Sequence, residues 1–220
     1  MTDRPTITAF NWAPEVARGL VRDMRVRWAL EEVGQPYDVR LVDGQTVKAA
    51  AHRGLQPFGQ VPTYQEGGLD LFESGAIVMY VARKYPGLLP DDPAGRIHAE
   101  QWVFAAMTSI ESTLDDLTKV NVVERDQPWA EDRRPLVEKR VHDRLDDLAA
   151  RLGNKDYLDG DFSVGDLMMA CVLRRLKRPG LLEAHPTLAA YLARCEARPA
   201  FQRAFEAHIA DFSDQPPIAA

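Results

Sequence analysis

The sequence predicts two domains, an α/β domain over residues 1–85 and an all-helical domain over residues 96–220. Strand and helix patterns alternate in the first part, whereas only helical periodicities follow it. The stretch between them, residues 85–95, reads YPGLLPDDPAG and holds three prolines and two glycines, a composition typical of a linker. These observations together predict an α/β fold followed by a helical bundle.

The first part contains four strand patterns and three helix patterns. In chain order we expect a strand at Thr6–Phe10, a helix at about Ala13–Val33, a strand at Tyr37–Val42 and a short helix or turn at Thr46–Arg53. A hairpin of Val61–Gln65 and Leu69–Phe72 follows, and then a helix at Ser74–Lys84 that begins with a hydroxyl residue. The first helix pattern rests on apolar residues that recur every four positions from Val16 to Trp28. This order predicts a βαβ unit followed by a hairpin, and therefore a mixed sheet.

Helical periodicity dominates the second part. The expected helices are Arg96 to about Val120, about Asp132–Gly153, Ser163–Arg178, Thr187–Ala197 and Ala200–Ile209. The segment Phe162–Asp166 fits a helix start, because Ser163 and Asp166 have the spacing of a capping box and Phe162 can pack onto the next turn.

Composition excludes several classes of protein. The 220 residues carry 27 Lys and Arg against 33 Asp and Glu, and the net charge of −6 disfavours nucleic-acid binding. No apolar run is long enough for a membrane span, and the N-terminus has no signal-like apolar stretch. Two cysteines, Cys171 and Cys195, provide neither a disulfide framework nor metal-type spacing, so we expect no metal and a cytoplasmic location.

The segment Gln56–Tyr80, QPFGQVPTYQEGGLDLFESGAIVMY, carries the chemistry. A cis Val61-Pro62 bond would turn the Val61 main chain toward an extended peptide ligand. At the next helix start, free amides and the Ser74 hydroxyl favour an anion, and Glu73 favours an ammonium group. One corner would then bind both ends of an amino-acid zwitterion. Alternatively, Glu73 and Ser74 only cap the helix.

Three segments resemble the glutathione S-transferase family. They are Pro57–Pro62 with Leu71–Ile77 and Tyr80, Val26–Glu32 with Gly34–Tyr37, and Phe162–Asp166. The resemblance spans almost the whole chain, and it implies a thioredoxin-like first domain, a helical second domain and glutathione as co-substrate.

The resemblance also implies a role for individual residues. Gln60 would bind the glycine end of glutathione or the nearby backbone, and Val61, followed by a cis Pro62, would pair main chain to main chain with the cysteinyl unit. Glu73 and Ser74 would hold the γ-glutamyl amine and carboxylate. The glycine carboxylate would contact a cation, and the sequence offers Lys48, His52 and Arg53 without deciding among them.

The residue that activates the glutathione thiol departs from the family pattern. Most of the family place a Tyr, Ser or Cys just after the first strand, but this chain has no Tyr before Tyr37, no Ser before Ser74 and no Cys before Cys171. A thiolate is the nucleophile, so a hydrogen-bond donor or a positive charge must replace the usual residue. The candidates are the Asn11 amide, the Trp12 indole, Arg18 and Arg22, with a helix start near Pro14 adding its dipole. We assign Asn11 as the donor and Arg18 as its helper, although Asn11 also suits a turn.

The predicted activity is that of a cytosolic detoxification enzyme, a transferase that attacks a small hydrophobic electrophile with the glutathione thiolate. Two alternatives remain: isomerase, dehalogenase or peroxidase chemistry on the same thiolate, and a non-catalytic module that binds glutathione or another protein. The family resemblance and the frequency of two-fold pairs predict a homodimer, with Phe58 as a candidate interface residue.

Overall fold

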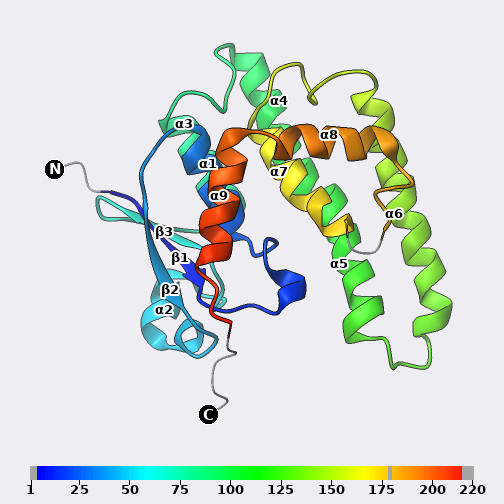
Figure 1. The fold of residues 1–220 in the computed structure, drawn as a ribbon, viewed down its shortest axis with the longest axis horizontal. Coiled ribbons are helices and arrows are strands. Elements are labelled where there is room, and N and C mark those ends of the chain that lie inside the picture. The colour runs from blue at the N-terminus through cyan, green and yellow to red at the C-terminus, as the bar shows by residue number, and fades with distance from the viewer. Residues whose placement is uncertain (1–3, 178–179, 215–220) are drawn as a thin grey trace. The chain divides into compact units, whose positions relative to one another are not determined.

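The computed structural model describes residues 4–177 and 180–214, and it divides into two compact units (Figure 1). One unit combines the chain up to Leu89 with the segment that begins at Ala197, and the other comprises Pro90–Glu196. The expected helical domain of residues 96–220 therefore differs from the observed unit at its C-terminal end. The last helix, α9 (Pro199–Ala210), packs with the N-terminal unit instead.

A four-stranded mixed sheet forms the centre of the first unit. Its strands are β1 (Thr6–Phe10), β2 (Asp38–Val42), β3 (Thr63–Glu66) and β4 (Leu69–Phe72), in the order β2-β1-β3-β4. β1 is parallel to β2 and antiparallel to β3, and β4 is antiparallel to β3. The predicted mixed sheet is confirmed, and the structure has β1 and β4 with the expected boundaries.

α1 is the central helix of the first unit. α1 (Asp23–Glu32) contacts β1, α3 (Ser74–Lys84) and α9, whereas the short α2 (Ala50–Leu55) follows β2 after the 3₁₀ turn η2 (Thr46–Lys48). Figure 1 shows α9, in red, alongside α1, in blue. The Trp28 ring of α1 meets the edge of the Phe201 ring of α9 at a centroid distance of 4.9 Å. This aromatic contact explains why the last helix belongs to the first unit.

The segment between β1 and α1 is a loop, so the prediction of a helix from Ala13 is wrong. Only the 3₁₀ turn η1 (Glu15–Ala17) forms there, and α1 starts at Asp23. Gly19 adopts φ +83°, a left-handed conformation that interrupts any right-handed helix. Val16, which began the apolar pattern, is 63% exposed. Residues 11–22 therefore form an irregular loop, the kind of segment in which binding and catalytic side chains commonly lie.

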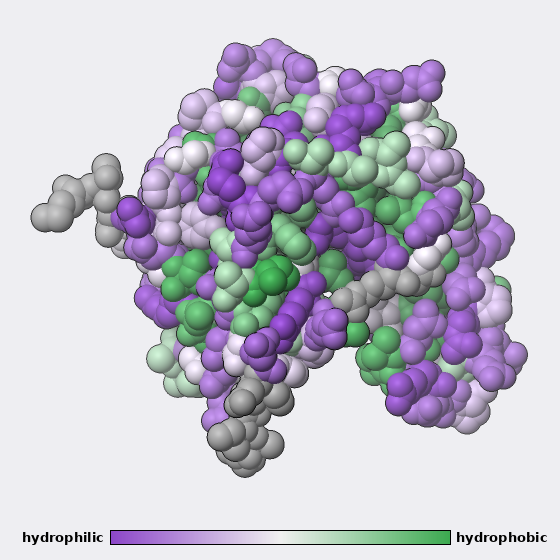
Figure 2. Space-filling view, viewed as in Figure 1, coloured by the Kyte–Doolittle hydropathy of each residue, from purple (hydrophilic) through white to green (hydrophobic). Residues whose placement is uncertain are grey.

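Helices make up the second unit. One helical path runs through α4 (Pro93–Phe104), the π-helical η3 (Ala105–Glu111), α5 (Ser112–Thr118) and the π-helical η4 (Lys119–Val123), and it is followed by α6 (Ala130–Leu152), α7 (Val164–Leu173), η5 (Arg174–Leu176) and α8 (Pro186–Glu196). Figure 2 shows the outer face of α6 as mainly hydrophilic, as its amphipathic sequence predicts.

The predicted capping box at the start of α7 is confirmed. The Ser163 amide donates to Asp166 Oδ2 at 3.0 Å, and the Ser163 hydroxyl accepts a bond from the start of the helix. Asp166 is fully buried and also accepts from the Leu158 amide and the Tyr191 hydroxyl, both at 2.9 Å. Burial raises the pKa of this carboxyl above its usual value, against the effect of these hydrogen bonds. Asp166 therefore supports the helical unit.

Candidate functional site

Three chain segments meet at one edge of the sheet in the first unit. In the antiparallel pairs, Ile7 lies opposite Tyr64 and Thr63 lies opposite Phe72. The end of β1, the start of β3 and the end of β4 therefore lie side by side. Phe10, the last residue of β1, packs in the same apolar cluster as Val61. This geometry gathers the predicted residues that follow β1, precede β3 and follow β4.

Val61 and Pro62 precede β3. The peptide bond between them is cis, as the resemblance implies. The Val61 side chain is 7% exposed and so belongs to the core. Within residues 4–177 and 180–214, no hydrogen bond engages the Val61 amide or carbonyl, whereas the next amide, that of Thr63, donates to Thr8 Oγ1 at 2.7 Å. The Val61 main chain can therefore pair with an extended ligand.

Glu73 and Ser74 form the junction between β4 and α3. Glu73 has φ +67°, and it is the one non-glycine residue with a positive φ in the described part of the chain. Such a strained conformation is typical of ligand-binding sites. Glu73 occupies the N-cap position, but its exposed side chain makes no cap, and Ser74 is the first residue of the helix. The interpretation of both side chains as simple caps is therefore wrong, and both remain candidates for ligand binding.

Arg25 of α1 is a residue that the sequence analysis missed. Its guanidinium Nη1 donates to Ser74 Oγ at 3.3 Å, and both residues are nearly buried, with exposed fractions of 4% and 3%. A buried positive charge beside the free amides of a helix start favours an anion there. No local pattern singles out Arg25, because only the packing of α1 against α3 brings it to Ser74.

Gln60 is held in place by two neighbours. Its amide donates to Gln56 Oε1 at 3.1 Å, and the Gln56 side chain donates to Gln60 Oε1 at 3.3 Å. His52 Nε2 lies 2.8 Å from the Gln60 carbonyl oxygen. His52 is 6% exposed, so it supports the chain before Val61 and does not act as a surface cation.

Lys48 and Arg53 are the other two cations considered for the glycine carboxylate. Arg53 Nη1 donates to the Pro57 carbonyl at 3.1 Å. Lys48 is exposed, and it makes no hydrogen bond or ion pair with any residue of the described ranges. Lys48 is therefore the better candidate of the two.

Asn11 immediately follows β1. Its amide donates to the Val42 carbonyl at 3.0 Å, and its carbonyl accepts from the Ser213 amide at 2.8 Å. These two bonds fix the main chain at the edge of the sheet. The side chain is half-buried, and its carboxamide has no hydrogen-bond partner among the described residues. The Asn11 Nδ2 group is therefore able to donate to a ligand.

Arg18 is tied to the C-terminal segment. Its Nε donates to the Ala13 carbonyl at 3.2 Å and its Nη2 to the Ser213 carbonyl at 2.8 Å. The guanidinium also lies over the Phe212 ring, with 5.6 Å from Cζ to the ring centroid. These contacts bind Nε and Nη2 to carbonyl groups of the protein. The Arg18 side chain is thus hydrogen-bonded to other parts of the chain, whereas the Asn11 carboxamide has no such partner among the described residues.

A second polar cluster surrounds Glu66 at the other end of β3. The hydroxyls of Tyr64 and Tyr80 donate to Glu66 Oε2 at 2.9 and 3.2 Å, and Lys84 forms an ion pair with the same carboxylate. Burial alone would raise the pKa of Glu66, but Lys84 and the tyrosine hydroxyls outweigh it and lower that pKa. All groups of this cluster have protein partners, so it joins the hairpin to α3 structurally.

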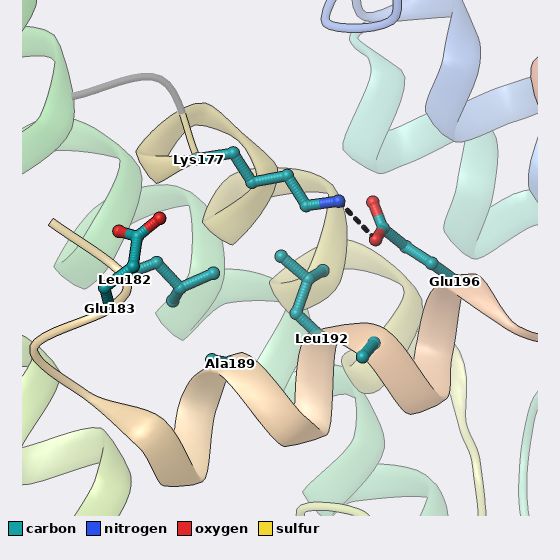
Figure 3. Close-up of a pocket in the computed structure, with 7 residues that line it drawn as sticks. Lys177, Leu182, Glu183, Ala189, Leu192 and Glu196 are labelled. Carbon is teal, nitrogen blue, oxygen red and sulfur yellow. Dashed lines mark hydrogen bonds and ion pairs between the residues drawn. The ribbon is translucent and has the colours of Figure 1, made fainter. Parts of the chain in front are cut away.

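The helical unit contains a separate pocket of about 330 Å³ (Figure 3). Leu182, Leu192 and Ala189 line it, and Lys177 pairs with Glu196 at 2.5 Å at its side. None of the predicted site residues lies there. Across residues 4–177 and 180–214, no group of His, Cys, Asp and Glu has an arrangement suited to a metal ion.

Comparisons with known proteins identify the family. The family model described as "Glutathione S-transferase, N-terminal domain" matches residues 16–83, and the model described as "Glutathione S-transferase, C-terminal domain" matches residues 124–194. Glutathione S-transferase 3 of Zea mays is 33% identical over 197 residues, which are 82% of this chain and 86% of the maize protein. The chain belongs to the glutathione S-transferase family.

Other members of the glutathione S-transferase family agree with this result. Glutathione S-transferase F14 of Arabidopsis thaliana is 28% identical over 206 residues, covering 86% of this chain and 81% of that protein. A glutathione transferase from Burkholderia graminis, crystallised with two glutathione molecules per subunit, superimposes with a TM-score of 0.79 at 27% identity, over 93% of this chain and 88% of that one. The thioredoxin-like fold with a helical C-terminal part is thus confirmed. No described helix of this transferase is long and apolar enough to span a membrane.

Proposed function

We propose that this protein is a glutathione transferase that activates the thiol of bound glutathione with the side chain of Asn11. Glutathione is the co-substrate, and a small hydrophobic electrophile is the second substrate. Gln60, Val61, Pro62, Glu73 and Ser74 bind the tripeptide as the family resemblance implies. Arg18 assists Asn11 by holding the loop and by its positive charge.

The observation that carries the proposal is the meeting of three segments at one sheet edge. The unpaired main chain of Val61 suits the cysteinyl unit of glutathione, because two extended chains pair through their amides and carbonyls. Arg25, Ser74 and the start of α3 suit a carboxylate, and the exposed Glu73 beside them suits an ammonium group. A cysteinyl unit paired with Val61 then has its sulfur near the end of β1, where Asn11 lies.

The proposed chemistry needs only a donor for the thiolate. The glutathione thiol releases its proton to solvent, and the Asn11 Nδ2–H group stabilises the remaining negative charge by donating a hydrogen bond. The thiolate sulfur then forms a bond to the electrophilic carbon, and the displaced electron pair leaves with the leaving group or moves to an acceptor atom of the substrate. Because a carboxamide is neutral, we expect the pKa of the bound thiol to fall only modestly.

Replacing Asn11 by Ala tests the assignment. We expect turnover to fall roughly 10- to 1000-fold, as when a preorganised donor is removed, while the affinity for glutathione stays nearly constant. The thiolate absorbance of bound glutathione, followed against pH, should show a higher pKa in the variant. If Arg18→Ala raises that pKa and Asn11→Ala does not, the arginine is the activating group. If bound glutathione titrates like free glutathione in the unmodified protein, the chain is a binding module.

We further infer that two chains form a homodimer. Phe58 is 64% exposed and meets the Phe72 ring at a centroid distance of 6.3 Å, and Phe72 and Leu69 are themselves 38% and 37% exposed. An exposed group of large apolar side chains supports a protein contact. Light scattering should give about twice the chain mass of 24.7 kDa, and the mass of a single chain at micromolar concentration would contradict this inference.

The proposed compartment is the cytoplasm. Both thiols, Cys171 and Cys195, are buried, at 8% and 0% exposure, which agrees with a reducing environment. Fluorescence of a tagged full-length chain would test the location, and a secreted product would contradict it.

A further inference from the structure

The segment that follows α9 is bound to the loop that carries Asn11. The Ser213 amide donates to the Asn11 carbonyl at 2.8 Å, and the Ser213 carbonyl accepts from Arg18 Nη2 at the same distance. Arg18 also stacks on Phe212, and its Nη1 lies 3.8 Å from Asp214 Oδ1. Both main-chain groups of one residue near the C-terminus therefore bind the loop between β1 and α1.

A second contact fixes the far end of the same loop. The Gly19 amide donates to His208 Nε2 at 3.2 Å, and His208 Nδ1 lies 2.9 Å from Asp23 Oδ2. Because Nε2 accepts from the Gly19 amide, Nδ1 carries the ring hydrogen and donates a hydrogen bond to Asp23 Oδ2. Asp23 and His208 are each 1% exposed, and Arg27 Nε donates to Asp23 Oδ2 at 2.8 Å. This buried network anchors α9 to the start of α1.

Together these contacts compensate for a loop that lacks regular structure. Between Asn11 and Arg22 the regular structure consists of the single 3₁₀ turn η1, and Val16 on that turn is 63% exposed. Such a loop is mobile unless other elements hold it. Ser213 makes hydrogen bonds with Asn11 and Arg18, and His208 of α9 accepts one from the Gly19 amide. The donor proposed for the thiolate thus depends on residues about 200 positions away in the sequence.

We propose that the segment Phe212–Asp214 is a strap that positions Asn11 for the reaction. The proposal rests on the proposed function, because it assigns Ser213 as a positioning residue for the Asn11 donor. The Ser213 main chain holds the Asn11 carbonyl, and Arg18 links the strap to the rest of the loop. Catalysis is sensitive to the placement of a donor at the level of about 1 Å. The strap therefore affects turnover more strongly than it affects glutathione binding, which uses Val61, Glu73 and Ser74.

The test uses the full-length chain with Ser213→Pro, which removes the amide that donates to Asn11. Ser213→Ala is the matched control because it keeps that amide. We expect Ser213→Pro to lower kcat about 10-fold, to change the KM for glutathione less than about twofold and to raise the pKa of the bound thiol. Ser213→Ala should lower kcat less than Ser213→Pro does, because it keeps the amide that donates to Asn11. Equal kcat and equal titration in the two variants would overturn the proposal.

Two further variants separate positioning from other effects. Arg18→Lys keeps the positive charge but loses the guanidinium bridge to the Ala13 and Ser213 carbonyls, so it should resemble Ser213→Pro. Full activity in Arg18→Lys would show that only its charge matters, and this would overturn the bridging role and with it the strap. This variant also serves if Ser213→Pro fails to fold, which circular dichroism would reveal.

The double variant Asn11→Ala/Ser213→Pro links the strap to its target. If the strap acts through Asn11, the double variant should be no slower than Asn11→Ala alone. A double variant whose kcat falls by the product of the two single-variant losses would overturn the proposal. If Ser213→Pro impairs turnover and Asn11→Ala does not, the assignment of Asn11 fails and the strap proposal fails with it. If Asn11→Ala impairs turnover and Ser213→Pro does not, only the strap proposal fails.

Discussion

The replacement of Ser74 by Ala should weaken glutathione binding by a predictable amount. Ser74 Oγ is nearly buried at the start of α3, and Arg25 already donates to it at 3.3 Å. Its own hydroxyl proton is therefore available for a carboxylate bound at this helix start. Such a hydrogen bond to a charged group contributes about 1–2 kcal/mol, which corresponds to a dissociation constant raised about 5- to 30-fold.

Calorimetry at a fixed pH and salt concentration measures this change directly. The matched control is Ser163→Ala, which removes a buried hydroxyl at the start of α7 and breaks a capping box. The control should lower the melting temperature and leave the dissociation constant unchanged. Turnover at saturating glutathione should stay nearly constant in Ser74→Ala, because the hydroxyl binds the γ-glutamyl end and not the sulfur. An unchanged dissociation constant in Ser74→Ala would refute the assignment of the anion site.

Three more changes test other parts of the structure. Glu66→Gln should lower the free energy of unfolding at pH 7. The folded pKa of Glu66 lies below its ordinary value of 4.5, so the difference in unfolding free energy between the variant and the unmodified protein should shrink as the pH falls through that folded pKa. Urea unfolding at several pH values measures this difference. Gly165→Ala should destabilise the helical unit by about 1–3 kcal/mol, because a Cβ at this position would lie 2.5 Å from Trp102 Cβ. The control Gly44→Ala places a Cβ where no atom lies within 4 Å, so it should leave the melting temperature nearly unchanged. Phe58→Ser should shift the light-scattering mass from dimer to monomer without lowering the melting temperature of the monomer, and an unchanged mass would exclude Phe58 from the interface.

Much of the fold follows from local signals. The alternating and apolar patterns of Thr6–Phe10 and Leu69–Phe72 correspond to β1 and β4, and Ser74–Lys84 corresponds to α3. The capping box at Ser163 and Asp166 is also local, since its two partners are three residues apart. In each case neighbouring residues determine the conformation, so one sequence suffices to predict it.

The helix expected from Ala13 failed because periodicity does not measure burial. Val16 and Leu20 extend the apolar spacing of α1 backward, yet Val16 is exposed and Gly19 takes a left-handed conformation. Three hydrogen bonds, two with Ser213 and one with His208 of α9, stabilise a loop there instead. Contacts between residues about 200 positions apart leave no local pattern, and the same holds for the placement of α9.

The candidate site was predictable in part. The residues of the Gln56–Tyr80 segment lie at one sheet edge, as expected from their order along the hairpin. The buried Arg25 beside Ser74 was not predictable, because its position depends on how α1 packs against α3. The hydrogen bond from Arg18 to the Ser213 carbonyl was likewise not predictable, since an arginine in a loop usually remains solvated.

The proposed function requires the Asn11 carboxamide to donate a hydrogen bond to the glutathione sulfur. A crystal structure of the protein with glutathione tests this most directly. We predict Asn11 Nδ2 within hydrogen-bond distance of the sulfur, at about 3.5 Å, with the Val61 main chain paired to the cysteinyl unit. A sulfur that instead contacts the Trp12 indole or an arginine guanidinium, with Asn11 out of reach, would refute the assignment of Asn11.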